Sequence, residues 1–180
     1  LLLNRPMTSN QNPEQQSRDH IDAQLKLAGW LVQDKSGINL NAGLGQAVRE
    51  YQTDVGPADY VLFVNHKAVG VIEAKREEEG HNITTVEEQT GGYATARLKW
   101  VNNSQPLRFL FESTGVITRF TDAADPHPRS REIFNFPRPE TLQEWSAQRQ
   151  SVRARLHNLP PLDPAGRRAC QVIALNNRDT

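Results

Sequence analysis

Asp59, Glu73 and Lys75 lie in two short apolar segments that follow one another closely. Both segments are rich in Val and Ile, so the sequence predicts two strands joined by the tight three-residue loop 65–67. If the strands pair antiparallel about His66, Asp59 falls opposite Glu73, and Lys75 projects from the same face two residues later. Charges beside a buried sheet are costly unless they are paired or bound to a metal, so this group is a candidate site.

Two carboxylates at that separation suit a hard, oxygen-seeking cation. Mg²⁺ binds through one or two carboxylates and keeps several of its waters. A lysine beside the metal can stabilise charge that builds on a phosphate oxygen, or can help to activate a metal-bound water. Phosphodiester cleavage needs these parts. The alternative is structural, namely a surface salt bridge among charged residues at strand ends.

The elements around the group favour an α/β fold. Asn12 and Pro13 form a helix start, and the first helix is predicted to run to about Ala28, with Gly29 as its stop. Both faces of the hairpin are apolar, which is typical of strands in the middle of a layered sheet. Further strands are predicted at 47–51, 107–111 and 115–120, and further helices at 85–98, 141–156 and 165–175. For the helix at 141–156, Thr141 is the expected N-cap and Glu144 completes a capping box.

The overall composition excludes several classes of protein. Lys+Arg and Asp+Glu both number 21, so any DNA binding has to come from local patches or from a partner subunit. Cys170 is the single cysteine, which excludes an internal disulfide and fits a reducing compartment. No apolar run approaches the length needed to span a membrane. We therefore expect a cytoplasmic protein without a membrane partner.

The run Asp59…Glu73-Ala74-Lys75 resembles the PD-(D/E)xK nuclease motif, although its Pro57 lies two positions before Asp59 and not next to it. More specifically, the chain resembles the N-terminal end of the restriction (motor) subunit of type I restriction-modification enzymes, from about residue 14 onward. The segments that carry this resemblance are Gly56-x-Ala58-Asp59-Tyr60-Val61-Leu62, Gly70-Val71-Ile72-Glu73-Ala74-Lys75, Arg18…Ile21-Asp22…Leu25…Ala28-Gly29-Trp30, Gln89-x-x-x-Tyr93 and Arg168-Ala169-Cys170-Gln171.

The resemblance implies a restriction-endonuclease-like core, in which helices flank a central mixed sheet, with a C-terminal helical extension. It implies that Asp59 and Glu73 ligate Mg²⁺ and that Lys75 is the catalytic lysine. The carbonyl of Ala74 would be the third protein ligand of the metal.

Four other residues have a functional and a structural interpretation. Gln89 and Tyr93 lie one helical turn apart and would contact DNA phosphates or sugars, or else form a half-buried helix face. Glu14 resembles an acid that some relatives bring to the metal, or else forms an exposed pair with Arg18. Glu50 either supports the metal ligands from behind or is an ordinary edge charge.

The expected organisation has three parts. Residues 1–12 are a disordered or vector-derived N-terminus, with the origin of residues 1–6 open, and residues 13–139 form the nuclease domain. Residues 140–180 are a connector helix and the start of an ATP-dependent motor domain, where Gln171 would recognise adenine. The sequence contains no GxxxxGK[ST] phosphate loop, so ATP would belong to the full-length subunit.

The leading functional hypothesis is an Mg²⁺-dependent DNA endonuclease domain of a type I site-specific deoxyribonuclease. Its substrate would be unmodified foreign double-stranded DNA, cleaved after ATP-driven translocation by the full-length protein. Its partners would be the modification and specificity subunits of the restriction complex. Two alternatives remain, namely a stand-alone RecB-like repair nuclease and a non-catalytic DNA-positioning or assembly module with an inactive nuclease fold.

Overall fold

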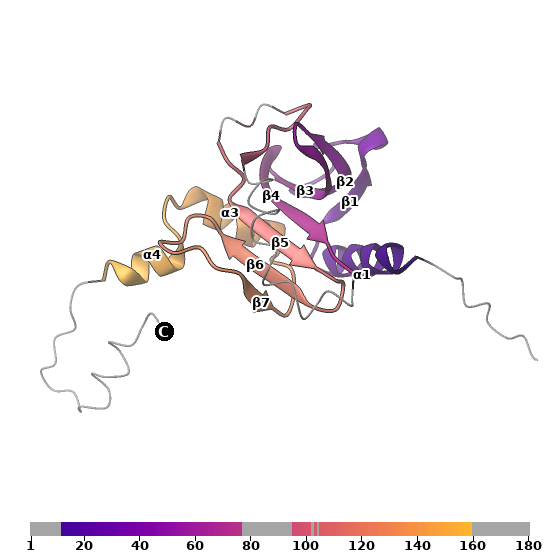
Figure 1. Cartoon of the computed structure of the whole chain (residues 1–180). Coiled ribbons are helices and arrows are strands. Elements are labelled where there is room, and N and C mark those ends of the chain that lie inside the picture. The colour runs from indigo at the N-terminus through magenta and orange to yellow at the C-terminus, as the bar shows by residue number, and fades with distance from the viewer. Residues whose placement is uncertain (1–11, 77–94, 102, 104, 160–180) are drawn as a thin grey trace, which may run out of the picture.

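The computed structural model of the chain (Figure 1) describes residues 12–76, 95–101, 103 and 105–159. Within these residues a seven-stranded mixed sheet forms the centre, and helices flank it, as the α/β prediction requires. The strands are β1 (Leu31–Asp34), β2 (Gly45–Thr53), β3 (Gly56–Val64), β4 (Lys67–Ala74), β5 (Phe109–Ser113), β6 (Thr118–Asp122) and β7 (Arg131–Ile133). The helices are α1 (Pro13–Leu27), α3 (Pro139–Ala147), α4 (Val152–His157) and the short 3₁₀ helix η1 (Lys35–Gly37). No helix in the described part of the chain is both long and apolar enough to cross a bilayer.

The strands lie in the sheet in the order of the chain, from β1 at one edge to β7 at the other. β1 pairs with β2 and β4 pairs with β5 in parallel, and the other neighbours are antiparallel. β3 and β4 are therefore interior strands, which explains why the hairpin is apolar on both of its faces.

Helix α1 follows the capping pattern of its sequence. The Asn12 side chain accepts a hydrogen bond from the Glu14 N–H at 3.4 Å, Pro13 occupies the first turn, and Gly29 lies just past the end with φ +90°. Glycine adopts this left-handed backbone conformation without the steric cost that a Cβ would cause. Ile21 and Leu25 are fully buried against the sheet, so the predicted first helix is confirmed.

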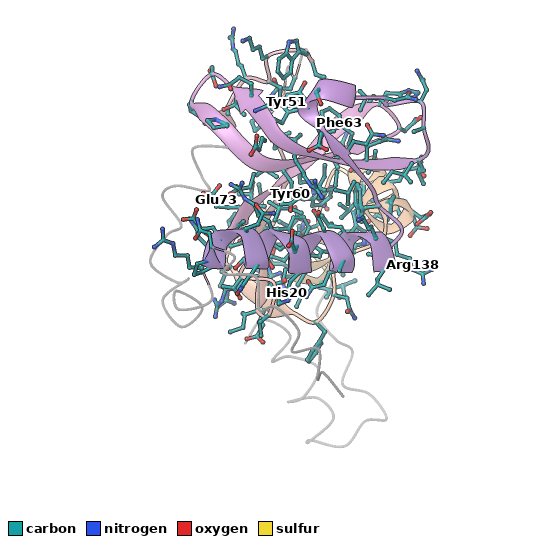
Figure 2. The ribbon with its side chains drawn as sticks, turned by 90° about the vertical axis from the view of Figure 1, so that its right-hand side faces the viewer. His20, Tyr51, Tyr60, Phe63, Glu73 and Arg138 are labelled. Carbon is teal, nitrogen blue, oxygen red and sulfur yellow. The ribbon has the colours of Figure 1, made fainter. Side chains whose placement is uncertain are left out.

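The sheet separates two apolar clusters. Figure 2 shows Tyr60 between α1 and the sheet, and Tyr51 and Phe63 on the sheet's other side. The cluster on the α1 side consists of Ile21, Leu25, Trp30, Ala47, Tyr60, Leu62, Val64, Ile72, Phe109, Phe111, Phe120, Phe136 and Leu142. The opposite cluster consists of Val48, Tyr51, Ala58, Val61, Phe63, Val71, Leu98 and Leu107. Both faces of β3 and β4 are thus covered.

The hairpin turn is one residue shorter than the sequence indicated. Val64 pairs with Lys67, so the loop consists of Asn65 and His66, whose φ angles of 47° and 66° are those of a type I′ turn. The register shifts between Leu62 and Phe63, and this bulge restores the predicted pairing farther along the strands. The three-residue loop was therefore wrong, whereas the register that matters for the site was right.

The single helix predicted at 141–156 was also wrong. α3 starts at Pro139 and stops at Ala147, and α4 starts anew after its own N-cap, Ser151, whose hydroxyl accepts from the Ala154 N–H at 3.1 Å. Thr141 lies inside α3 and caps nothing.

The break between α3 and α4 has a side-chain cause. The Arg108 guanidinium donates to the Trp145 carbonyl at 2.5 Å and to the Gln148 carbonyl at 2.8 Å, which satisfies the end of α3. The other two nitrogens of Arg108 donate to Asp122 on β6, at 2.7 and 2.8 Å. An arginine from outside the helix thus ends it.

Other predicted elements are only partly within the described residues. Residues 85–94 of the second predicted helix and the whole helix at 165–175 lie outside them. The second helix does not extend to Leu98, because Leu98 forms an antiparallel bridge with Thr53. The strand β7 was not predicted, because Pro and charge dominate the sequence around it. The strand predicted at 115–120 begins only at Thr118.

Candidate active site

The candidate site is built on a row of carboxylates that crosses four neighbouring strands. Tyr60 pairs with Ile72, so the next step along β3 and β4 brings Asp59 opposite Glu73, as predicted. The parallel pairing of β4 with β5 places Glu112 opposite Glu73. On the other side, the pairs that flank Glu50 and Asp59 in β2 and β3 place these two residues opposite each other. Figure 2 shows Glu73 near one end of α1.

Asp59 is held by two hydrogen bonds. Its Oδ1 accepts from Arg18 Nη2 of α1 at 2.5 Å, and its Oδ2 accepts from the Ala74 N–H at 2.9 Å. The side chain is only 16% exposed, so both bonds are shielded from water. An exposed pair of Arg18 with Glu14 was one of the two interpretations of Glu14, but Arg18 reaches Asp59 and, at 3.5 Å, Glu50.

Glu73 and Lys75 form a loose ion pair. Lys75 Nζ lies 3.4 Å from Glu73 Oε1, and the two side chains are 10% and 16% exposed, respectively. Glu73 Oε2 is buried and has no hydrogen-bond partner among the described residues. Burial, followed by the negative charge of Asp59, raises the pKa of Glu73, and Lys75 only partly opposes this. One oxygen of Glu73 can therefore accept a proton or a cation.

Glu112 is the member of the row that the sequence did not reveal. It is 5% exposed and directly follows two apolar residues of β5, as Glu73 directly follows two apolar residues of β4. Its charge contributes to raising the pKa of Glu73. The matching strand ends were a signal, but the parallel pairing that joins them spans a long crossover and cannot be read from either strand.

Glu14 and Glu50 lie at the rim of the site. Glu14 Oε1 accepts from Arg76 at 2.7 Å, which brings the first turn of α1 to the residue that follows Lys75. The hydrogen bond and charge of Arg76 lower the pKa of Glu14. Glu50 has a left-handed φ of 48° and accepts from Lys35 at 2.9 Å, and this contact lowers its pKa. Both rim acids therefore already have a cationic partner.

Only one of the remaining predicted site residues, Ala74, lies within the described residues. Ala74 ends β4, and its N–H is the group that orients Asp59. Gln89, Tyr93 and Gln171 lie outside the described residues. The structure therefore brings Asp59, Glu73 and Lys75 together at one end of the β3–β4 pair. The positions of the predicted DNA-contacting and adenine-contacting residues remain predictions.

The residues fit a hard divalent cation in donor chemistry. Carboxylate oxygens are the ligands that Mg²⁺ prefers, and Glu73 Oε2 is a buried oxygen without a partner. Within the described ranges, no group of three or more His, Cys, Asp and Glu side chains is arranged to hold a metal ion. A cation at Asp59 would have to compete with Arg18 for Oδ1, because that oxygen already accepts a charged hydrogen bond.

Comparison with known proteins points to one family. Residues 31–115 match the family model described as the second domain of the type I restriction enzyme EcoKI endonuclease subunit. A relative named Type I restriction enzyme EcoKI endonuclease subunit, from Escherichia coli (strain K12), is 42% identical over 74 residues. This alignment covers 35% of the chain and 6% of the relative. No solved structure matches. Over the strands that carry Asp59, Glu73 and Lys75, the chain is therefore similar to the endonuclease subunit of type I restriction enzymes, as its motifs indicated.

Proposed function

We propose that the chain contains the DNA-cleaving centre of a type I restriction endonuclease subunit. The observation that carries the proposal is the strand-end group of Asp59, Glu73 and Lys75, in which a buried carboxylate oxygen of Glu73 lacks a partner. The group lies inside the segment that is similar to the restriction subunit. Structural salt bridges usually satisfy their buried oxygens, so the unsatisfied oxygen supports a ligand-binding site.

Each residue of the proposed centre has a role. Asp59, Glu73 and the carbonyl of Ala74 would hold Mg²⁺, which when bound would polarise the phosphate and acidify a water. The Ala74 N–H keeps the Asp59 carboxylate turned toward the end of β4. Lys75 places its ammonium beside Glu73, where it stabilises negative charge developing on the phosphate oxygens. Gln89 and Tyr93 are proposed to position the DNA.

The full-length protein carries the rest of the proposed activity. The aligned segment spans 6% of the relative's length, so most of a protein of that kind lies beyond it. We propose that modification and specificity subunits select unmodified double-stranded DNA and that an ATP-driven motor, with Gln171 near the adenine, moves it before cleavage. The proposed compartment is the cytoplasm, where the DNA to be cleaved would enter.

The test is cleavage of a plasmid that carries the recognition site. The complete complex is incubated with Mg²⁺ and ATP, and Lys75→Ala and Asp59→Ala are compared with wild type. Each variant should lower the cleavage rate by about 100-fold or more while DNA-stimulated ATP hydrolysis persists, because the motor does not use these residues. Arg129→Ala, an exposed arginine away from the site, is the control. Cleavage at the wild-type rate by both variants would refute the assignment.

A non-catalytic role is the second candidate, because Arg18 already neutralises Asp59. In a site that has lost metal binding, this ion pair would serve only to stabilise the fold. Titration of the chain with Mn²⁺, followed by electron paramagnetic resonance, separates the two roles. Binding that disappears in Asp59→Ala and Glu73→Ala supports the nuclease, and no such binding in wild type supports the inactive module.

A further inference from the structure

The segment 95–101 is fixed against the turn between β2 and β3. The Asp54 N–H donates a hydrogen bond to the Arg97 carbonyl at 3.0 Å, and the Arg97 N–H donates to Asp54 Oδ1 at 2.8 Å. The Lys99 N–H donates to the Gln52 carbonyl at 3.1 Å, and Leu98 forms a bridge with Thr53. The segment therefore adds a short extended edge beside the turn between β2 and β3.

Alternate residues of this segment face opposite ways. Ala96 and Leu98 are buried, whereas Arg97 and Lys99 are exposed, as expected for an extended chain lying on a core. Asn103 braces the inner side, because its amide donates to the Ala96 carbonyl at 2.8 Å and accepts from the Leu98 N–H at 2.9 Å. The two cationic side chains are thus presented from a fixed backbone, about 7 Å apart along the chain.

Trp100 is exposed beside these cations. Its side is supported by Tyr51, whose buried ring meets it edge-on at a centroid distance of 5.3 Å, yet Trp100 remains 56% exposed. Lys99 Nζ lies 5.6 Å from the centre of the Trp100 ring. The Lys99 ammonium and the Trp100 ring are within the range of a cation–π contact, and more than half of the Trp100 side chain stays open to a ligand.

The segment lines a hollow of about 850 Å³. Its described lining residues are Thr95, Arg97, Leu98, Lys99, Trp100, Val101, Asn103, Gln105 and Pro106, and none of these is acidic. Neither Arg97 nor Lys99 forms a salt bridge with another residue that the structure describes. The nearby Asp54 is engaged with the Arg97 backbone N–H. The hollow therefore carries local positive charge on a chain whose net charge is zero.

The segment that lines the hollow is connected to β3, the strand that carries Asp59, through the turn between β2 and β3. Leu98 bridges Thr53, and Thr53 pairs with Gly56. Asp59 is three residues beyond Gly56, which is about 10 Å along a strand. Leu98 also shares an apolar cluster with Val71, and Glu73 projects from the same face of β4 as Val71.

We propose that the hollow lined by Arg97, Lys99 and Trp100 binds a DNA strand on its way to the candidate site. The two cations contact neighbouring phosphates, and the Trp100 ring stacks on a base that has left the duplex. This inference rests on the proposed nuclease function and adds a surface that guides the substrate. DNA is favoured as the occupant because the hollow combines positive charge with an exposed aromatic face.

The test measures binding of duplex and single-stranded oligonucleotides to the 180-residue chain by fluorescence anisotropy. EDTA is present, so nothing is cleaved, and NaCl is varied. Arg97→Gln combined with Lys99→Gln should lower the slope of log affinity against log salt by about two, because two phosphate contacts are lost. Trp100→Leu should weaken single-stranded binding by about tenfold and duplex binding less, whereas Trp100→Phe should retain most of the affinity.

The matched control removes two exposed charges elsewhere. Lys26→Gln combined with Arg129→Gln changes the net charge equally, and both residues are exposed. Thermal melting of each variant verifies that it is folded. Equal salt slopes in the two double variants, no binding by the wild type at low salt, or tighter binding of RNA than of DNA would each overturn the proposal.

The outcomes separate the hollow from the nuclease. Loss of salt slope in the Arg97/Lys99 variant, with Lys75→Ala cutting at the wild-type rate, would keep the DNA-binding surface and refute the nuclease. An unchanged slope, with cleavage abolished by Lys75→Ala, would keep the nuclease and refute the DNA-binding surface.

Discussion

Asp59 and Glu73 are opposite each other on adjacent strands, but their surroundings differ sharply. Both oxygens of Asp59 accept hydrogen bonds, one from Arg18 and one from the Ala74 N–H. Glu73 has one loose contact with Lys75, and its other oxygen has no partner among the described residues. One carboxylate has both oxygens occupied by donors, while the other is left under-neutralised. The two acids therefore contribute unequally to the stability of the folded site.

A similar contrast separates the acid beside α1 from the acids of β4 and β5. On the α1 side, Asp22 accepts from Arg49 and, at 2.8 Å, from the hydroxyl of Tyr60. Burial raises the pKa of Tyr60 to about 12, so this hydroxyl stays protonated and keeps donating. Toward β5, Glu73 meets the negative charge of Glu112. Charge is thus balanced next to the helix, whereas the charge of Glu112 adds to the effects that raise the pKa of Glu73.

Removing the under-neutralised acid should have the largest effect. Glu73→Gln should weaken Mn²⁺ binding by more than about 100-fold, since even groups behind metal ligands are worth 10–100-fold. The free energy of unfolding without metal should stay equal or rise, because a poorly paired buried charge is removed. Mn²⁺ titration and urea unfolding in EDTA measure the two. A large loss of stability together with unchanged Mn²⁺ affinity would mean that Glu73 is purely structural.

Removing Arg18, the partner of Asp59, should raise the affinity for the metal. Arg18→Gln frees Asp59 Oδ1, so Mn²⁺ should bind about tenfold more tightly. The free energy of unfolding should fall by about 1 kcal/mol, a modest loss because Arg18 is partly exposed. Arg18→Lys serves as the control that keeps the charge. Weaker Mn²⁺ binding in Arg18→Gln would show that Arg18 assists the metal site and does not compete with it.

The pH dependence of stability should report on the environment of Glu73. The pKa of Glu73 is raised above its ordinary value by burial, so the folded state binds the proton more tightly than the unfolded state. Between these two pKa values, the contribution of Glu73 to the free energy of unfolding therefore decreases as pH rises. Urea unfolding in EDTA at several pH values should show this decrease in wild type and less of it in Glu73→Gln. Parallel curves would contradict the environment described for Glu73.

The smallest effect should come from the rim. Glu14 and Arg76 form an exposed pair, and such pairs contribute less than about 1 kcal/mol. Glu14→Gln should therefore leave thermal stability nearly unchanged and should alter Mn²⁺ affinity by less than about threefold. A drop as large as that of Glu73→Gln would instead place Glu14 among the metal ligands, as the resemblance to some relatives implies.

The features that could be predicted from the sequence are those that depend on residues near one another in the chain. The register of Asp59 and Glu73 followed from two apolar strands spaced evenly about a turn, and the bulge near Phe63 left it intact. The caps of α1 followed from Asn12 and Gly29. Long-range partners could not be predicted, because nothing in the sequence links Arg18 to Asp59 across 41 residues.

The position of Glu112 was hidden for the same reason. Its role depends on which strand lies beside β4, and a parallel neighbour is reached only through a long crossover. The end of α3 depends likewise on Arg108, a residue about 40 positions earlier in the chain. Local propensity at 141–156 therefore indicated one helix where the fold has two.

Arg108 also makes the junction between the sheet and the C-terminal helices a mechanical linkage. One guanidinium holds Asp122 of β6 on one side and two carbonyls at the end of α3 on the other. A pull on α3 has to break these bonds together or shift the sheet with it. Arg108 directly precedes β5, so the end of α3 is tied to the strand that carries Glu112.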